Sequence, residues 1–271
     1  MAAQGLHVPA PRRLAGGRSN HVWRAGAVVI KLYAADAGNP LFANDPARER
    51  AVLAALSGTG MVPPLVQAGT FAGRQWLSYA HINGQPWRQA PGHVAQVLGR
   101  LHDCAPPAGL PPGVNGSLAL EAQVAGILRQ CRDGHWLTDL RPLGRVPPVP
   151  QPVLIHGDPV PGNLLAHDGT LTLIDWQCPQ IGDPAEDLAL FLSPAMQLTY
   201  RGAPLSRSEE DAFLQAYPDP RIVGRYLALR PWYHWRMAAY CQWRMEQGSG
   251  ADRQALALEC AALQSISPRA A

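Results

Sequence analysis

The sequence feature that most constrains this chain is the segment 156–165, HGDPVPGNLL, which sets polar side chains at a fixed spacing between apolar flanks. A second carboxylate, Asp175, follows in an Ile-Asp-Trp tripeptide, after a stretch whose turn residues favour a hairpin. A short strand, a loop and this hairpin can bring Asp158, Asn163 and Asp175 together at one edge. The spacing is specific, so we interpret it as a functional site rather than an incidental polar loop.

These residue types suit phosphoryl transfer, a reaction that depends on positioning and on positive charge near the phosphates. Asp158 can orient an acceptor hydroxyl and accept its proton, and Asn163 and Asp175 offer the hard oxygen ligands that Mg²⁺ prefers. His156 is either a general base or a structural residue whose ring hydrogen-bonds nearby backbone, and we favour the structural role. A metal-dependent hydrolase built on His156, Asp158 and Asp175 is a weaker alternative.

Residues 1–82 have the pattern of a small β-rich lobe with one helix. Two apolar runs of β type enclose a segment of helical spacing that has a proline near its start: 27–33, 75–82 and 46–56. Lys31 lies in the first run, where a lysine is either an exposed edge residue or a buried charge with a partner. Glu49 on the helix can supply that partner, so we expect a Lys31–Glu49 pair.

Residues 83–271 are mostly helical in pattern and form the second expected lobe. Amphipathic helices are predicted first, and further helical segments follow after two proline-rich loops: 94–104, 118–132, and from 183 onward with breaks near Pro194, Pro204 and 218–220. The sequence therefore predicts an α+β fold of two lobes, 1–82 and 83–271, with the polar motif in the second.

Composition argues against several functions. The formal net charge is only +3 and no run of Lys or Arg occurs, so we expect no nucleic-acid partner. Five scattered cysteines without a Cys-x-x-Cys pair predict reduced thiols rather than a zinc site or a disulfide framework. No secretory apolar region and no membrane-spanning stretch is visible. We therefore expect a cytoplasmic protein without membrane association, and no protein partner is indicated.

The motif H-G-D-x₄-N-L-L followed by I-D-W resembles the aminoglycoside phosphotransferase and choline kinase superfamily, and the chain is nearest in appearance to bacterial choline- and thiamine-kinase-like phosphotransferases. The resemblance extends across most of the chain. It implies a protein-kinase-like fold of two lobes, with ATP and Mg²⁺ bound in the cleft between them. It also favours the structural role for His156.

The resemblance assigns a role to several further positions. Residues 14–20 look like the glycine turn of choline kinases, which binds phosphates through Gly16, Gly17, Ser19 (in place of Thr) and Asn20. Lys31 matches the phosphate-binding lysine that Glu49 holds in place. The segment 77–84 resembles the hinge that binds adenine through main-chain groups, here of Ala80 and Ile82. Family members often carry Glu at position 80, so the preference for ATP over GTP stays open.

The acceptor is less specified. Asp183 begins a segment that reads as a helix cap, a capping box with Glu186, and a role in binding a cationic acceptor is the lesser interpretation. Trp232 and Trp235 lie on one helix face, as core residues or, less favoured, as a cage for a cation. We expect ATP-dependent phosphorylation of a hydroxyl on a small cationic amino alcohol or thiamine-like molecule. The alternatives are an aminoglycoside kinase and a non-catalytic nucleotide-binding regulator.

Overall fold

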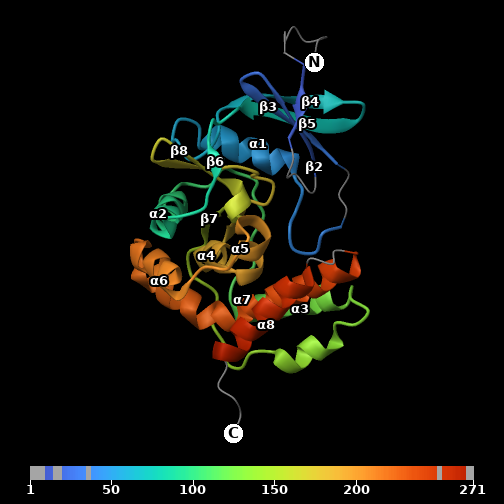
Figure 1. Cartoon of the computed structure of the whole chain (residues 1–271), viewed down its shortest axis with the longest axis vertical. Helices are drawn as coiled ribbons and strands as arrows, with labels where there is room; N and C mark the ends of the chain where they lie inside the picture. The colour runs from blue at the N-terminus through green and yellow to red at the C-terminus, as the bar shows by residue number, and fades with distance from the viewer. Residues whose placement is uncertain (1–9, 15–19, 35–37, 249–251, 267–271) are drawn as a thin grey trace.

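The computed structural model describes residues 10–14, 20–34, 38–248 and 252–266. The glycine turn predicted to bind phosphates, with Gly16, Gly17 and Ser19, lies outside these residues. The described chain forms a β-sheet region at one end and a helical region at the other, which confirms the predicted two-lobe α+β fold (Figure 1).

The first lobe is built on a five-stranded antiparallel sheet in the order β1-β2-β3-β5-β4. Its strands are β1 (Arg12–Arg13), β2 (Asn20–Ala25), β3 (Val28–Tyr33), β4 (Leu65–Phe71) and β5 (Arg74–Ala80). A tight turn at Gly26, with φ of 63°, joins β2 to β3 and places Lys31 opposite both Val22 and Leu77. Lys31 is therefore on an inner strand and not at an edge.

The helix α1 (Pro46–Ala55) packs against this sheet. Its start is specified locally, because Asp45 caps the helix by accepting hydrogen bonds from the backbone of Ala47 and Arg48, and Pro46 occupies the first turn. This start places Glu49 on the buried face of the helix, toward β3.

The second lobe combines two small sheets with a bundle of helices. The sheets pair β6 (Gln85–Pro86) with β8 (Leu164–His167) and β9 (Thr170–Leu173), and β7 (Val153–Ile155) with β10 (Gln180–Gly182). The β8–β9 hairpin forms as predicted, because Asp168 and Gly169 both adopt positive φ at its turn.

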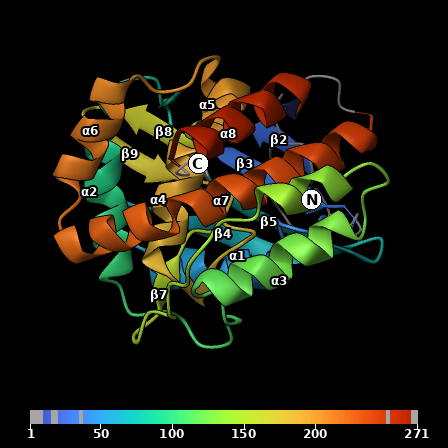
Figure 2. The same cartoon turned by 90° about the horizontal axis from the view of Figure 1, so that it is seen from below.

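The longest helix of the described chain, α7 (Pro220–Glu246), lies between α3 (Ser117–Leu128) and α8 (Asp252–Ile266) (Figure 2). The remaining helices are α2 (Pro91–His102), α4 (Pro184–Leu192), α5 (Pro194–Arg201), α6 (Arg207–Ala216) and the 3₁₀ turns η2 (His135–Leu140) and η3 (Pro161–Asn163). None of the helices in the described part of the chain is long and apolar enough to cross a bilayer.

The main hydrophobic core includes residues of both lobes. Trp176, the residue after the predicted metal ligand, is fully buried in it, and its indole nitrogen donates to the carbonyl of Leu173 at 2.9 Å. The backbone N–H of Leu173 in turn donates to the carbonyl of Met61 in the first lobe, at 2.8 Å. The strand that leads to Asp175 is thereby anchored to both lobes.

Candidate active site

The loop that carries Asp158 follows β7 and turns sharply at Gly157. This glycine has a φ of 78°, and a Cβ atom there would lie 2.2 Å from the backbone oxygen of Cys178, so only glycine fits. Beyond the turn, Asp158 is buried and receives two hydrogen bonds from the side-chain amide of Asn163, at 2.9 Å to its carbonyl and 3.0 Å to its carboxylate. The structure thus brings Asp158 and Asn163 into direct contact.

His156 is a structural residue of this loop. Its Nδ1 accepts the backbone N–H of Asp158 at 3.2 Å, so the proton is on Nε2, which donates to the carbonyl of Ile174 at 3.1 Å. Burial lowers the pKa of the ring and keeps it neutral. With both nitrogens occupied, the imidazole joins the Asp158 loop to the segment before Asp175 and is not free to act as a general base.

Asp187 of α4 binds the backbone of the same loop. Its carboxylate accepts the backbone N–H groups of His156 and Gly157 at 2.8 and 2.9 Å, and Nε2 of His102 lies 3.1 Å away. Asp187 is fully buried in the first turn of α4. Asp187 therefore braces the loop through hydrogen bonds to its backbone.

Lys31 lies between two carboxylates from different parts of the chain. Its ammonium group contacts Oε2 of Glu49 at 2.6 Å and also forms an ion pair with Oδ1 of Asp175. Tyr33 donates a second hydrogen bond to Glu49. Burial alone would lower the pKa of Lys31, but the charges of Asp175 and Glu49 outweigh it and raise the pKa, so the amine is protonated.

The environment of Asp158, in contrast to that of Lys31, favours the neutral form of the side chain. Burial raises its pKa well above the ordinary value, and the negative charge of Asp175 raises it further, while the hydrogen bond from Asn163 lowers it. A carboxylate with a raised pKa is a stronger proton acceptor than an exposed aspartate. The site therefore places a basic carboxylate beside a protonated lysine.

Asn163 and Asp175 have the chemistry expected for a magnesium site. The amide nitrogen of Asn163 donates to the backbone carbonyl of Asp158, so Oδ1 is the side-chain atom of Asn163 that could bind a metal. Asp175 has a φ of 64°, and its carboxylate is about one-third exposed in the pocket. Two such oxygens suit Mg²⁺, which is commonly held by few protein ligands together with phosphates, and the described residues contain no larger cluster of metal-binding side chains.

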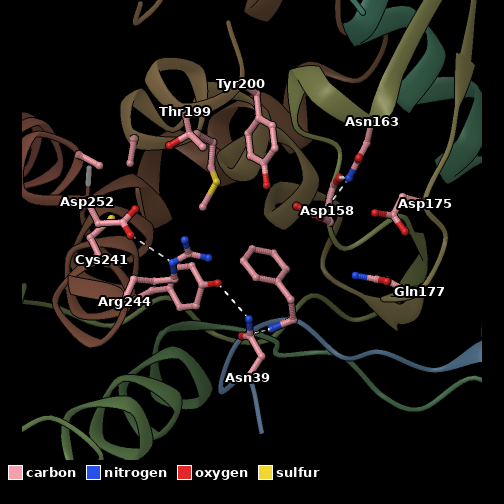
Figure 3. Close-up of a pocket in the computed structure, with 15 residues that line it drawn as sticks. Asn39, Asp158, Asn163, Asp175, Gln177, Thr199, Tyr200, Cys241, Arg244 and Asp252 are labelled. Atoms are coloured by element: carbon pink, nitrogen blue, oxygen red, sulfur yellow. Dashed lines mark hydrogen bonds and ion pairs between the residues drawn. The ribbon is translucent and has the colours of Figure 1, made fainter. Parts of the chain in front are cut away.

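A pocket opens directly above these side chains (Figure 3). Asp158, Asn163, Asp175 and Gln177 form one wall, and residues of α5, α7, α8 and the loop before α1 form the others. The second group comprises Asn39, Phe42, Ala195, Met196, Thr199, Tyr200, Tyr240, Cys241, Arg244, Asp252 and Ala255. Sequence reasoning missed these residues, because each lies in a loop or on one face of a helix whose position depends on packing.

The three predicted acceptor residues, Asp183, Trp232 and Trp235, lie outside this pocket. Trp232 and Trp235 are buried in the hydrophobic core, where their rings contact edge to face and the Trp235 indole donates to the carbonyl of Leu137 at 2.6 Å. Asp183 is fully buried, caps α4 through the backbone of Ala185, and forms a two-pronged ion pair with Arg225. These three residues do not line the pocket.

Two details of the local predictions are corrected or refined. The capping box expected at Asp183 is incomplete, because Glu186 does not return to the cap but pairs with the buried Arg236 at 2.8 Å. Asn20, expected at the phosphates, is buried in a network of side-chain amides. The two residues predicted to bind adenine through the main chain lie at the end of β5 (Ala80) and in the link from β5 to β6 (Ile82).

The fold and site together define a class of protein. A β-rich lobe with a paired lysine, a helical lobe with an Asp–Asn loop, and a second aspartate at the cleft are the arrangement of kinase-like phosphotransferases. The model of one family, described as the phosphotransferase enzyme family, matches residues 3–231. The chain belongs to this family and is a small-molecule kinase.

Solved structures with the same fold come from several members of this class. A choline/ethanolamine kinase family protein from Mesorhizobium loti aligns with a TM-score of 0.64 and 15% identity, over 94% of this chain and 87% of that one. The choline kinase LicA from Streptococcus pneumoniae aligns with a TM-score of 0.61 and 17% identity, over 97% and 96%. A spectinomycin phosphotransferase in complex with ADP and spectinomycin gives 0.59 and 14%, over 97% and 93%. A search of curated proteins finds no match.

Proposed function

We propose that this enzyme transfers the γ-phosphoryl group of ATP to a hydroxyl of a small cationic molecule, an amino alcohol or a thiamine-like compound. The observation that carries the proposal is the convergence of Asp158, Asn163 and Asp175 at one wall of one pocket, with the buried Lys31 ion-paired to Asp175. A positive charge for phosphates, a basic carboxylate for a hydroxyl and two metal-binding oxygens are what phosphoryl transfer needs.

Each residue has a defined role in this proposal. Lys31, held by Glu49, binds the α- and β-phosphates, and Asp158 orients the acceptor hydroxyl and takes its proton. Asn163 and Asp175 hold Mg²⁺, which when bound neutralises charge on the phosphates. Nucleotide binding further involves the main chain at Ala80 and Ile82 and the glycine turn at 16–19.

The pocket composition supports an acceptor with one positive charge. Phe42 and Tyr240 pack edge to face, with ring centroids 5.2 Å apart, and Tyr200 lines the same pocket (Figure 3). Aromatic faces attract quaternary and primary ammonium groups. These rings, rather than the tryptophans of α7, are the groups that an ammonium would meet beside Asp158.

The same pocket argues against a polycationic aminoglycoside. Among its described carboxylates, Asp175 is paired with Lys31 and Asp252 is paired with Arg244 at 3.2 Å, so only Asp158 is without a cationic partner. Because Arg244 and Asp252 balance each other's charge, the far wall offers a polycation no second unpaired carboxylate among the described residues. A single ammonium group fits this balance better than several.

The test is an acceptor screen that measures ADP formation and the mass of the phosphorylated product. We expect product with choline, ethanolamine or thiamine, and loss of product in the Asp158→Asn variant with ATP affinity retained. Transfer to kanamycin or spectinomycin but to none of the small cations would replace the proposed acceptor with an aminoglycoside. ATP binding without product from any acceptor would instead indicate a nucleotide-binding regulator.

A further inference from the structure

Three side-chain amides join the first lobe to the segment after Asp175. The side-chain nitrogen of Asn20 donates to Oδ1 of Asn44 at 2.8 Å and to Oε1 of Gln177 at 2.9 Å. Oδ1 of Asn20 accepts from the backbone N–H of Ala34 and from the amide of Asn44, both at 3.0 Å. Asn20 is 8% exposed and Gln177 is 5% exposed, so these bonds are protected from solvent.

The direction of each hydrogen bond among these three side-chain amides follows from one backbone group. A backbone N–H can only donate, so the atom of Asn20 that faces Ala34 must be its oxygen. The other atom of that amide is therefore the NH₂ group, which can only donate to Gln177. Gln177 must accept with Oε1, and its own NH₂ group is consequently turned away from Asn20.

This NH₂ group faces the catalytic pocket. Gln177 lines the same wall as Asp158, Asn163 and Asp175, and the nitrogen end of its side chain points into the pocket in Figure 3. Its backbone is also fixed, because its carbonyl accepts the N–H of Asp45, the residue that caps α1, at 3.4 Å. A neutral donor is thus held in one orientation on the same pocket wall as the carboxylate proposed to receive the acceptor.

Resting on the proposed function, we propose that Gln177 is a further catalytic residue, whose Nε2 donates a hydrogen bond to the phosphoryl group in transit. In that step the bond between the γ-phosphorus and the ADP oxygen breaks, a bond to the acceptor oxygen forms, and the hydroxyl proton moves to Asp158. Gln177 keeps both of its protons and stabilises the charge on the equatorial phosphoryl oxygens. Donors that are oriented before the reaction need no reorganisation during it.

The alternative is that Gln177 only joins the lobes. A joining role requires Oε1 and the backbone carbonyl, but it does not use Nε2. The two roles therefore differ in what happens when the NH₂ group alone is changed. Gln177→Glu keeps the shape and an oxygen that accepts from Asn20, but it presents a carboxylate oxygen to the phosphoryl group. Gln177→Met keeps the length and removes both polar atoms.

The experiment measures the affinity of the full-length enzyme for two probes by titration calorimetry: Mg·ADP, and Mg·ADP with aluminium fluoride, which resembles the phosphoryl group in transit. We expect affinity for the aluminium fluoride complex to fall about 10- to 100-fold in Gln177→Met, and further in Gln177→Glu. Affinity for Mg·ADP should change less than twofold. The exposed substitution Gln96→Met serves as the matched control and should change neither value.

Equal losses for both probes would overturn the proposal, because they would mark Gln177 as a structural residue. Unchanged affinity for the aluminium fluoride complex, or tighter binding by Gln177→Glu, would overturn it as well. If Gln177→Met does not fold, the Glu variant alone decides between the outcomes. Because no acceptor is used, failure of the acceptor screen and failure of this inference are separate results.

Discussion

At the scale of single residues, the site is a place where charge is held at a cost to stability. Asp158 is buried next to another carboxylate, and its raised pKa means that the folded state disfavours the ionised form. Active sites often retain such groups because the chemistry needs them. The cost can be measured, because asparagine has nearly the same shape and can still accept the hydrogen bond from Asn163.

We predict that Asp158→Asn abolishes phosphoryl transfer and raises the free energy of unfolding by about 1 kcal/mol or more at pH 7. The folded wild-type protein binds the Asp158 proton more tightly than the unfolded chain does, so its deficit relative to the variant disappears as the pH falls through the raised pKa toward about 4. Urea denaturation between pH 4 and 8 would measure both effects, with the exposed substitution Asp139→Asn as control. A variant that is less stable than the wild type at pH 7 would contradict the prediction.

At the scale of secondary-structure elements, α4 supports the loop that carries Asp158 through one side chain. Asp187 satisfies two backbone N–H groups of that loop and contacts His102 of α2, whose other ring nitrogen lies 2.6 Å from the hydroxyl of Tyr217. The chain of contacts therefore runs from α2 and the end of α6 to the turn at Gly157. Any change in Asp187 should be felt in the position of Asp158.

We predict that Asp187→Asn lowers the free energy of unfolding by about 2–4 kcal/mol, because an amide can accept only one of the two buried N–H groups with its oxygen. The rate of phosphoryl transfer should fall about 10- to 100-fold through displacement of the loop. Denaturant titration and steady-state kinetics would test this, with Asp168→Asn at the exposed hairpin turn as the matched control, since asparagine tolerates positive φ. Equal stability of the variant and the wild type would refute the bracing role.

The sequence predicted elements where local signals set their ends, and missed them where distant contacts did. The β8–β9 hairpin formed as expected because its turn pair requires positive φ. Helix α3 was expected to reach Arg132 but ends at Leu128, because the carboxylate of Glu246 captures the backbone N–H groups of Arg132 and Asp133 at 2.6 and 3.0 Å. No pattern in the sequence near residue 130 signals a partner from the end of α7.

The same distinction holds for the site. Asp158 and Asn163 could be paired from the sequence because they are five residues apart, and the Lys31–Glu49 contact because the strand and the helix were both evident. The contact between Asn20 and Gln177 spans 157 positions and joins two uncharged side chains, which carry no signal of pairing. Sequence reasoning therefore anticipated contacts among the residues that the proposed function uses, but not the polar network behind them.

At the scale of the whole molecule, the two lobes meet at the site through a few polar contacts. The ion pair between Lys31 and Asp175 is one of them, and it occupies both groups that the proposed function assigns to phosphates and metal. Nucleotide and Mg²⁺ would therefore have to exchange this contact for new ones. Anything that binds the folded state more tightly than the unfolded chain raises its stability by mass action.

We predict that Mg·ADP at about 100 times its dissociation constant stabilises the wild-type protein by about 2.7 kcal/mol. ADP at the same concentration with EDTA should stabilise it less, because Asp175 and Asn163 then hold no metal between them and the phosphates. In Asp175→Ala the two conditions should give the same shift, whereas the exposed substitution Asp139→Ala should behave as the wild type. Thermal unfolding followed by fluorescence would measure the shifts, and a retained Mg²⁺ effect in Asp175→Ala would move the metal site elsewhere.

The single backbone group that orients the amides of Asn20, Asn44 and Gln177 also has a consequence for evolution. Hydrogen-bond donors and acceptors alternate along this series of amides. If an acid replaces one amide, a donor is lost and the neighbouring side chain must supply a donor where it supplied an acceptor. We therefore expect these three positions to covary across homologues, although positions 20 and 177 lie far apart in the sequence. A lineage that altered one of them alone would lose fitness until a second substitution restored the alternation.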